Sequence, residues 1–178
     1  SRSLGSKAAM ITKFFLILAF HFSVFAAASS SSLDLLKNEL KKNYSFVERS
    51  LNQSDLKIET STGKIFFDKT GVTVNVLTPF EENYRVEDGK LEIHDVFLDQ
   101  KQIVDINDID NFFLNILIDG IDDSAKGYSI NQIDDSTLQI ISTNRSDLIS
   151  FSFLDNKLNL IRYKDSIGVE HGIELTPL

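Results

Sequence analysis

Hydrophobic and polar residues alternate with a period of two along most of the chain after residue 55, which is the spacing of half-buried β-strands. Turn residues separate the alternating runs, and Asp-Gly within Glu87–Lys90 favours a tight hairpin. The alternating runs are Leu56–Thr60, Lys64–Asp68, Gly71–Val76, Tyr84–Val86, Leu91–His94, Gln102–Ile106, Gly127–Ile133, Thr137–Ser142, Leu148–Leu154, Leu158–Tyr163 and Gly172–Thr176. Thr62-Gly63 is expected to end the first of these strands. Taken together, the runs predict one antiparallel sheet of about nine or ten strands.

Two segments follow the period of a helix instead. Leu33, Leu36, Leu40 and Tyr44 form one apolar stripe with charged residues between them. The second helix is predicted over Asn107–Gly120, with apolar residues at Ile109, Phe112, Phe113, Ile116 and Leu117. Asn107 or Asp108 is its expected N-cap, and Gly120 is its expected end.

A single antiparallel sheet of this length is expected to curl, because strands twist and a flat sheet leaves its edges exposed. The fold class predicted is therefore mainly β with two or three helices. In this fold a single curled antiparallel sheet forms an unclosed β-barrel covered by a helical lid. The inward face would be apolar, with Phe66, Val72, Val74, Val76, Leu91 and Ile93 as candidates, although the alternation does not decide which parity faces inward. Periodicity supports two arrangements equally. Either the sheet and the helices enclose an apolar ligand cavity, or the helices fill that space and no ligand is held.

The N-terminal part has the features of a secretory signal peptide over residues 10–28. Lys13 supplies the positive charge, Phe14–Phe25 the apolar stretch and Ala26–Ala28 the small residues of a cleavage site. Residues 1–9 precede Met10, the sole methionine, and are interpreted as upstream or added sequence. We therefore expect export out of the cytoplasm and one mature domain over residues 29–178.

Charge and cysteine content narrow the classes of function. The chain has 26 acidic and 18 basic residues, a formal charge of -8, which opposes binding to nucleic acid. It has no cysteine, so an exported form has neither a disulfide nor a lipid-modified cysteine. The sequence thus predicts a protein that works without a lipid anchor and is stabilised by an ordinary core.

The sequence offers few candidates for catalytic residues. After export only His94 and His171 remain, without metal-ligand spacing, and neither an H-E-x-x-H motif nor a G-x-S-x-G elbow occurs. The acidic stretches lack the spacing of a calcium loop and are interpreted as solvated turns. We expect no enzyme activity, no metal site and no cofactor.

An ordered set of short motifs resembles the periplasmic outer-membrane lipoprotein carrier family (LolA-like; LolA/LolB superfamily). These motifs are Gly63-Lys64-Ile65-Phe66-Phe67, then Pro79, then the hairpin from Tyr84 to Asp95, then Leu98–Gln102. The likeness covers most of the mature chain in element order, and Asn111–Gly120 stands where the family has its lid helix. The related outer-membrane receptor (LolB-like) is anchored through a lipidated cysteine, so the missing cysteine favours the soluble carrier.

The resemblance implies a monomeric carrier that shields the acyl chains of lipoproteins and shuttles them from the inner to the outer membrane. Its implied partners are acylated lipoproteins, an inner-membrane lipoprotein-releasing transporter complex and an outer-membrane acceptor lipoprotein. The alternatives are a periplasmic half-barrel scaffold or regulatory protein that binds a protein partner, and a carrier of other lipids. The candidate residues for the acyl cavity and lid are Ile65, Phe67, Val74, Val76, Leu91, Ile93, Phe112, Phe113, Ile116 and Leu117.

The sequence departs from the family in two places. Where the family often has Lys-Arg-Pro, with an arginine that tethers the lid, this chain has Asp68-Lys69-Thr70. Lys69 is therefore the candidate lid clasp, although an ammonium lacks the planar fork of a guanidinium. The family also continues beyond the point where this chain ends, so the chain is expected to be a short form or incomplete.

Overall fold

A computed structural model describes residues 31–122 and 127–178. The predicted signal peptide and residues 1–9 lie outside the described residues. The described strands are β1 Tyr44–Asn52, β2 Lys57–Phe67, β3 Gly71–Thr78, β4 Glu82–Glu87, β5 Lys90–Asp95, β6 Gln100–Asp105, β7 Tyr128–Asp134, β8 Thr137–Ser142, β9 Leu148–Leu154, β10 Lys157–Lys164 and β11 Glu170–Pro177. The described helices are α1 Ser32–Glu39, a 3-10 turn at Ile106–Asp108, and α2 Phe112–Asp119.

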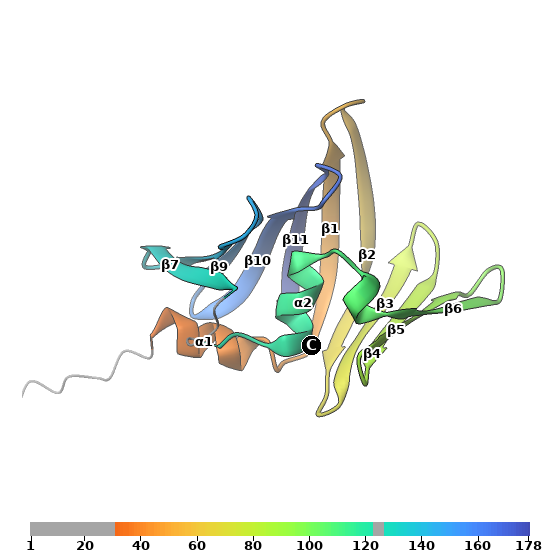
Figure 1. Cartoon of the computed structure of the whole chain (residues 1–178), viewed down its shortest axis with the longest axis horizontal. Coiled ribbons are helices and arrows are strands. Elements are labelled where there is room, and N and C mark those ends of the chain that lie inside the picture. The colour runs from red at the N-terminus through yellow and green to blue at the C-terminus, as the bar shows by residue number, and fades with distance from the viewer. Residues whose placement is uncertain (1–30, 123–126) are drawn as a thin grey trace, which may run out of the picture.

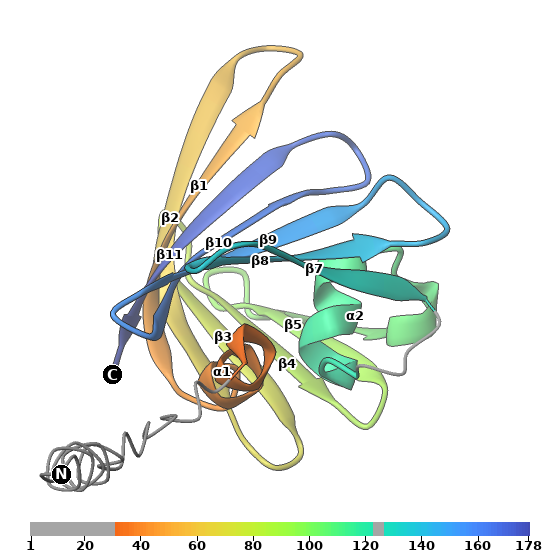
Figure 2. The same ribbon diagram turned by 90° about the vertical axis from the view of Figure 1, so that its left-hand side faces the viewer.

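All eleven described strands form one antiparallel sheet in the order β6-β5-β4-β3-β2-β1-β11-β10-β9-β8-β7. The first and last strands of this order, β6 and β7, do not pair with each other, so the barrel is unclosed. The sheet curls, and both helices lie on its concave side (Figures 1 and 2). The predicted fold class, an unclosed β-barrel covered by a helical lid, is confirmed.

Two local predictions around the first strands were wrong. Tyr44 does not continue the first helix, because α1 ends at Glu39 and Tyr44 begins β1, a strand the alternation did not reveal. Gly63 does not end a strand but lies inside the continuous β2. A Cβ at this position would lie 2.1 Å from the backbone oxygen of Asn75, so only glycine allows this close approach.

The second helix begins later than predicted. Residues Ile106–Asp108 form a separate 3-10 turn, and the N-cap of α2 is Asn111, whose side chain accepts a hydrogen bond from the backbone amide of Leu114 at 3.0 Å. The predicted end is confirmed: Gly120 adopts a φ of 74°, which favours glycine. The Asp-Gly hairpin is also confirmed, since Asp88 and Gly89 both have positive φ between β4 and β5.

The strand register decides which parity faces inward. Ile65 pairs with Val74 and Phe67 pairs with Val72, and these residues belong to or pack against the buried core. Phe66 therefore lies on the opposite face of β2, so its predicted inward position was wrong. Toward the β6 edge of the sheet, Val86 of β4 pairs with Leu91 of β5, and both are buried. The apolar concave face therefore extends to β5.

Candidate functional site

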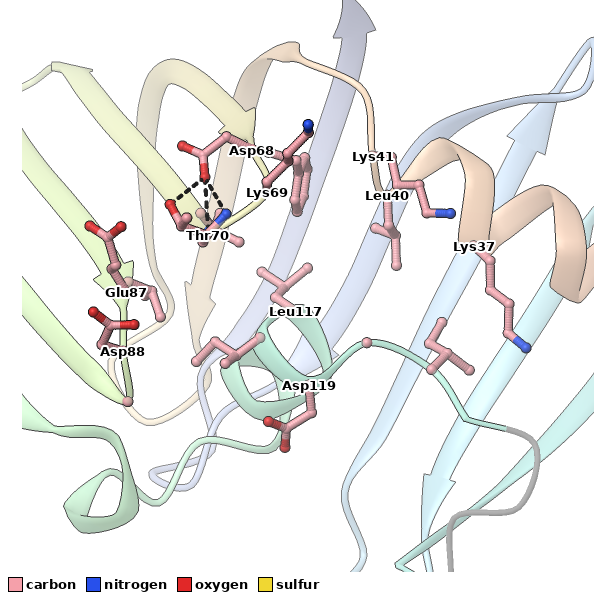
Figure 3. A pocket seen from close by; sticks show the side chains of 18 residues that line it. Lys37, Leu40, Lys41, Asp68, Lys69, Thr70, Glu87, Asp88, Leu117 and Asp119 are labelled. Carbon is pink, nitrogen blue, oxygen red and sulfur yellow. Dashed lines mark hydrogen bonds between the residues drawn. The ribbon is translucent and has the colours of Figure 1, made fainter.

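A cleft of about 780 Å³ opens on the concave side of the sheet. It lies between α1, the β2–β3 turn, the β4–β5 turn and the C-terminal half of α2 (Figure 3). Its lining residues are Lys37, Leu40, Lys41, Phe67, Asp68, Lys69, Thr70, Gly71, Val72, Val86, Glu87, Asp88, Gly89, Leu117, Ile118, Asp119, Gly120 and Ile121. A volume of this size is typical of a small-molecule or lipid site.

The cleft combines apolar side chains with a charged rim. Its apolar lining comes from Leu40, Phe67, Val72, Val86, Leu117, Ile118 and Ile121. On the rim, Lys37 of α1 and Lys41 in the turn after α1 lie on one side, and the carboxylates of Glu87 and Asp88 lie on the other (Figure 3). This arrangement suits an amphipathic ligand whose apolar part is buried and whose polar part reaches solvent.

α2 is unusually apolar for a helix that is not enclosed by the fold. Six of its eight residues are hydrophobic, yet only Ile116 is fully buried. Leu117 and Ile118 face the cleft instead of the core. A helix of this kind leaves apolar surface that a ligand can cover, as a lid over an apolar cavity would.

The β2–β3 turn at the cleft edge is held firmly. The Asp68 carboxylate accepts hydrogen bonds from the backbone amides of Thr70 and Gly71, both at 2.9 Å, and from the Arg85 guanidinium at 2.7 Å. The Arg85 guanidinium, with the help of the Thr70 amide and hydroxyl, holds the pKa of Asp68 well below its usual range. The turn therefore forms a fixed wall of the cleft.

A polar cluster occupies the concave face at the opposite end of the strands. The imidazole of His171 lies between two carboxylates, with Nδ1 at 2.6 Å from Oε1 of Glu48 and Nε2 at 3.2 Å from Oδ2 of Asp165. Burial alone would lower the pKa of His171, but the two carboxylates outweigh it and raise the pKa above its ordinary value. Hydrogen bonding to His171 in turn lowers the pKa of Glu48, against the effect of burial.

An aromatic stack joins this polar cluster to α2. The ring of Tyr163 lies parallel to the His171 imidazole, with centroids 4.6 Å apart and an interplanar angle of 5°. Tyr163 also stacks on Phe113, with centroids 4.3 Å apart at 21°. The N-terminal end of α2 thus rests on β10 and, through Tyr163, on β11.

The residues predicted from the sequence fall in four places. Phe67, Lys69 and Leu117 line the cleft, while Phe112 and Phe113 line a second hollow of about 250 Å³ beside Tyr163. Ile65, Leu91 and Ile116 are buried. Val74 and Val76 pack against the core, and Ile93 is half-buried on the same face of the sheet. The acyl-cavity assignment of these residues stays a prediction.

Other cleft residues were not singled out by sequence reasoning. Leu40 and Val86 stood in a predicted helix and a predicted hairpin, but only the tertiary arrangement brings them to the same cleft. Ile118 lies within α2 but outside its predicted apolar stripe, and Ile121 follows the helix end. A signal for both was present, because they continue the apolar character of α2 past its inner stripe.

Lys69 does not contact α2 through any hydrogen bond or ion pair recorded among the described residues. Its side chain is exposed, and Figure 3 shows its ammonium group directed away from Leu117. The predicted clasp role of Lys69 stays a prediction.

Within residues 31–122 and 127–178, no group of three or more histidine, cysteine, aspartate or glutamate side chains is arranged to hold a metal ion. No helix in the same part of the chain is both long and apolar enough to cross a membrane.

The structure defines the class of fold as an unclosed antiparallel barrel with a helical lid. Some solved proteins are partly similar to it in shape. No family model matches the sequence, and neither does any curated protein. An uncharacterized conserved protein from Thermus thermophilus is similar over 83% of this chain and 86% of its own, with 11% identity and a TM-score of 0.42. LprF from Mycobacterium bovis is similar over 82% and 91%, with 13% identity and a TM-score of 0.37.

A candidate outer membrane lipoprotein-sorting protein domain from Vibrio parahaemolyticus is similar over 81% of this chain and 89% of its own. Its identity is 7% and its TM-score is 0.38. Likenesses this distant assign no function, so the function proposed below rests on the residues of this chain.

Proposed function

We propose that this protein is a carrier that shields the acyl chains of lipoproteins in the cleft under α2. The observation that carries the proposal is a cleft of about 780 Å³, with apolar side chains inside a charged rim, beside a lid helix that leaves most of its hydrophobic side chains short of full burial. The motif resemblance to periplasmic lipoprotein carriers supports the same assignment. Such a carrier needs no catalytic group.

The physical basis of binding is the burial of methylene groups. Each acyl methylene moved from water into an apolar site contributes about 0.8 kcal/mol. The same ligand would cover Leu117 and Ile118, which line the cleft. Release then requires that α2 move, because a long acyl chain held this way dissociates slowly.

The proposed route is from an inner-membrane releasing complex, across the periplasm, to an outer-membrane acceptor. It presumes export through the segment at residues 10–28, which can be tested by fractionating the cells that express the full chain. Recovery of a periplasmic protein whose N-terminus begins near residue 29 is the expected result. A full-length cytoplasmic protein would overturn the route while leaving acyl binding in place.

Acyl binding is tested with the full chain, extracted gently and analysed by mass spectrometry for co-purified lipids or lipoproteins. Titration with a fluorescent long-chain fatty acid gives the affinity. Leu117→Glu places a carboxylate on the cleft lining and is expected to weaken binding at least about tenfold, since a buried unpaired charge is costly.

Ile103→Glu is the matched control, because Ile103 is 66% exposed and its strand position faces away from the cleft. It should leave the affinity within about twofold. Equal affinities for both variants, or a protein that neither carries nor binds acyl chains, would overturn the proposal.

A second candidate function is that of a scaffold that binds a protein partner. It is favoured by Phe80 and Phe97, which are 73% and 87% exposed in the β3–β4 and β5–β6 connections. A backbone hydrogen bond from Val96 to Glu81 joins these connections at 3.1 Å, so they are neighbours. Retention of a partner by the native chain but not by Phe80→Ser/Phe97→Ser, without acyl binding, would favour the scaffold.

A further inference from the structure

Aromatic rings connect the N-terminal end of α2 to the sheet. Phe113 of α2 stacks on Tyr163 of β10, and Tyr163 stacks on His171 of β11. The rings form a continuous column that runs from the lid helix to the sheet. Aromatic pairs in such geometry contribute about 0.5–1.5 kcal/mol each beyond the area they bury.

The column ends on an imidazole whose position is fixed by two carboxylates. Glu48 of β1 is itself held by the Ser61 hydroxyl of β2 at 3.1 Å. Asp165 is fixed by the backbone amides of Ile167 and Val169 at 3.1 and 2.8 Å. His171 is therefore held from both sides by anchored acceptors.

Both contacts require that His171 be charged. A neutral imidazole carries one N–H and one lone pair, so one of its nitrogens would face a carboxylate oxygen without a proton between them. The imidazolium donates from both nitrogens and also stacks favourably on the electron-rich ring of Tyr163. The groups that face the cluster from the packed elements include Glu48, Asp165, Tyr163 and the Ser61 hydroxyl. Tyr84 of β4 also faces it, and its phenol donates to Glu82 and interacts with the Glu48 charge. Arg145 and Lys164 also line the second hollow beside Tyr163 and Asp165.

We propose that Phe113, Tyr163 and His171 are the clasp that holds α2 closed, and that the charge on His171 sets how firmly it holds. Protonated His171 keeps the column aligned, and loss of the proton loosens it. The inference deepens the proposed function, because α2 covers the ligand cleft. It can fail independently, since closure of α2 is measured without any ligand.

The test uses the full chain, which has no native cysteine, with Ile116→Cys as the single thiol. Ile116 is 3% exposed, so a thiol reagent reaches this position only when α2 opens. Adding Phe113→Leu or Tyr163→Leu should raise the labelling rate about three- to tenfold. Phe112→Leu is the matched control on the same helix, because Phe112 lies outside the column and meets Tyr128 edge-on at 6.5 Å. Equal rates for Phe112→Leu and Phe113→Leu would overturn the clasp.

The role of charge is read from the pH profile. The labelling rate of Ile116→Cys is divided by the rate of the same thiol in His171→Gln, so the pH dependence of the thiol chemistry cancels. The ratio should be lowest at pH 6 and rise at least about threefold toward one as the imidazolium is titrated. A ratio that does not change with pH would overturn the role of charge.

Glu48→Gln separates this coupling from a purely structural role. It removes one of the carboxylates that favour the imidazolium, so the midpoint of the profile should move to lower pH. Glu174→Gln, an exposed carboxylate on β11, should leave the midpoint in place. If Tyr163→Leu does not fold, as judged by thermal unfolding, Phe113→Leu carries the clasp test by itself. A midpoint that moves equally in both glutamate variants would overturn the assignment to Glu48.

Discussion

The carboxylate of Glu39, the last residue of α1, accepts a hydrogen bond from the backbone amide of Leu158 in β10 at 3.1 Å. Glu39 is the buried acidic residue among those the structure describes, and it also accepts hydrogen bonds from the Tyr44 hydroxyl at 2.8 Å and from the Lys42 ammonium. Burial alone would raise the pKa of Glu39, but these three donors outweigh it and place the pKa below its ordinary value. The carboxylate thereby fastens α1, one wall of the cleft, to the sheet.

Replacing Glu39 is expected to destabilise the fold. Glu39→Gln keeps the size of the side chain but removes its charge and leaves at least one donor poorly paired. We expect the free energy of unfolding in urea to fall by about 2 kcal/mol. Glu174→Gln, which breaks an exposed ion pair with Arg49, should change it by less than about 0.5 kcal/mol. Similar losses in the two variants would contradict the anchoring role of Glu39.

His171 should make stability decline toward alkaline pH. Its pKa is raised in the folded protein, so its contribution is fully present below the unfolded pKa of about 6.5 and is lost as pH rises through the folded value. The melting temperature of the native chain minus that of His171→Gln should therefore fall between pH 6 and pH 9. A difference that grows over this range would show that the sign is wrong.

The carboxylates have the opposite sign. The pKa values of Glu39, Glu48 and Asp165 are lowered by folding, so the stability they contribute is present above their unfolded values and is lost as pH falls through the folded ones. As pH falls below 4.5, the melting temperature measured by circular dichroism should drop by fewer degrees in Glu39→Gln than in the native chain. An unchanged acid limb would argue against the Glu39 assignment.

Gly63 should tolerate no side chain. A Cβ would lie 2.1 Å from the Asn75 backbone oxygen and 2.7 Å from the ring of Phe46. Gly63→Ala is expected to cost about 2–4 kcal/mol in urea unfolding, because both neighbours belong to the sheet and cannot both retreat. Gly127→Ala is the control, since nothing lies within 4 Å of its Cβ, and it should be near neutral.

Lys69 offers a comparison between two candidate clasps. The structure gives its exposed side chain no bond to α2 among the described residues, so Lys69→Met should leave labelling of Ile116→Cys within about twofold. A rise as large as that of Tyr163→Leu would instead support the sequence-based assignment of the clasp to Lys69.

Much of the sheet could be predicted because a strand with one buried face carries its own period. Thr137–Ser142 and Leu148–Leu154 match β8 and β9 at both ends, and the Asp-Gly hairpin is placed correctly. β1 was missed because its inward positions include Glu48 and Ser50 beside Tyr44 and Phe46, so the apolar alternation breaks halfway. Asn111 was missed as the N-cap because Asn107 and Asp108 offer the same chemistry earlier in the chain.

The candidate site was predictable only in part. The sequence shows the apolar face of α2 and the alternating hydrophobic positions of β2, β3 and β5. The sequence did not show which of these positions line the cleft, the core or the second hollow. That division depends on the distance between the two curled halves of the sheet.

By itself, the sequence determined a mainly β chain with an apolar lid helix ending at Gly120, because periodicity and caps are local properties. Only the tertiary structure decided that Ile65, and not Phe66, faces inward, since inward parity depends on which face the helices cover. It alone brought Phe113, Tyr163 and His171 into one column, because pairing of β10 with β11 and docking of α2 join residues that no local pattern connects.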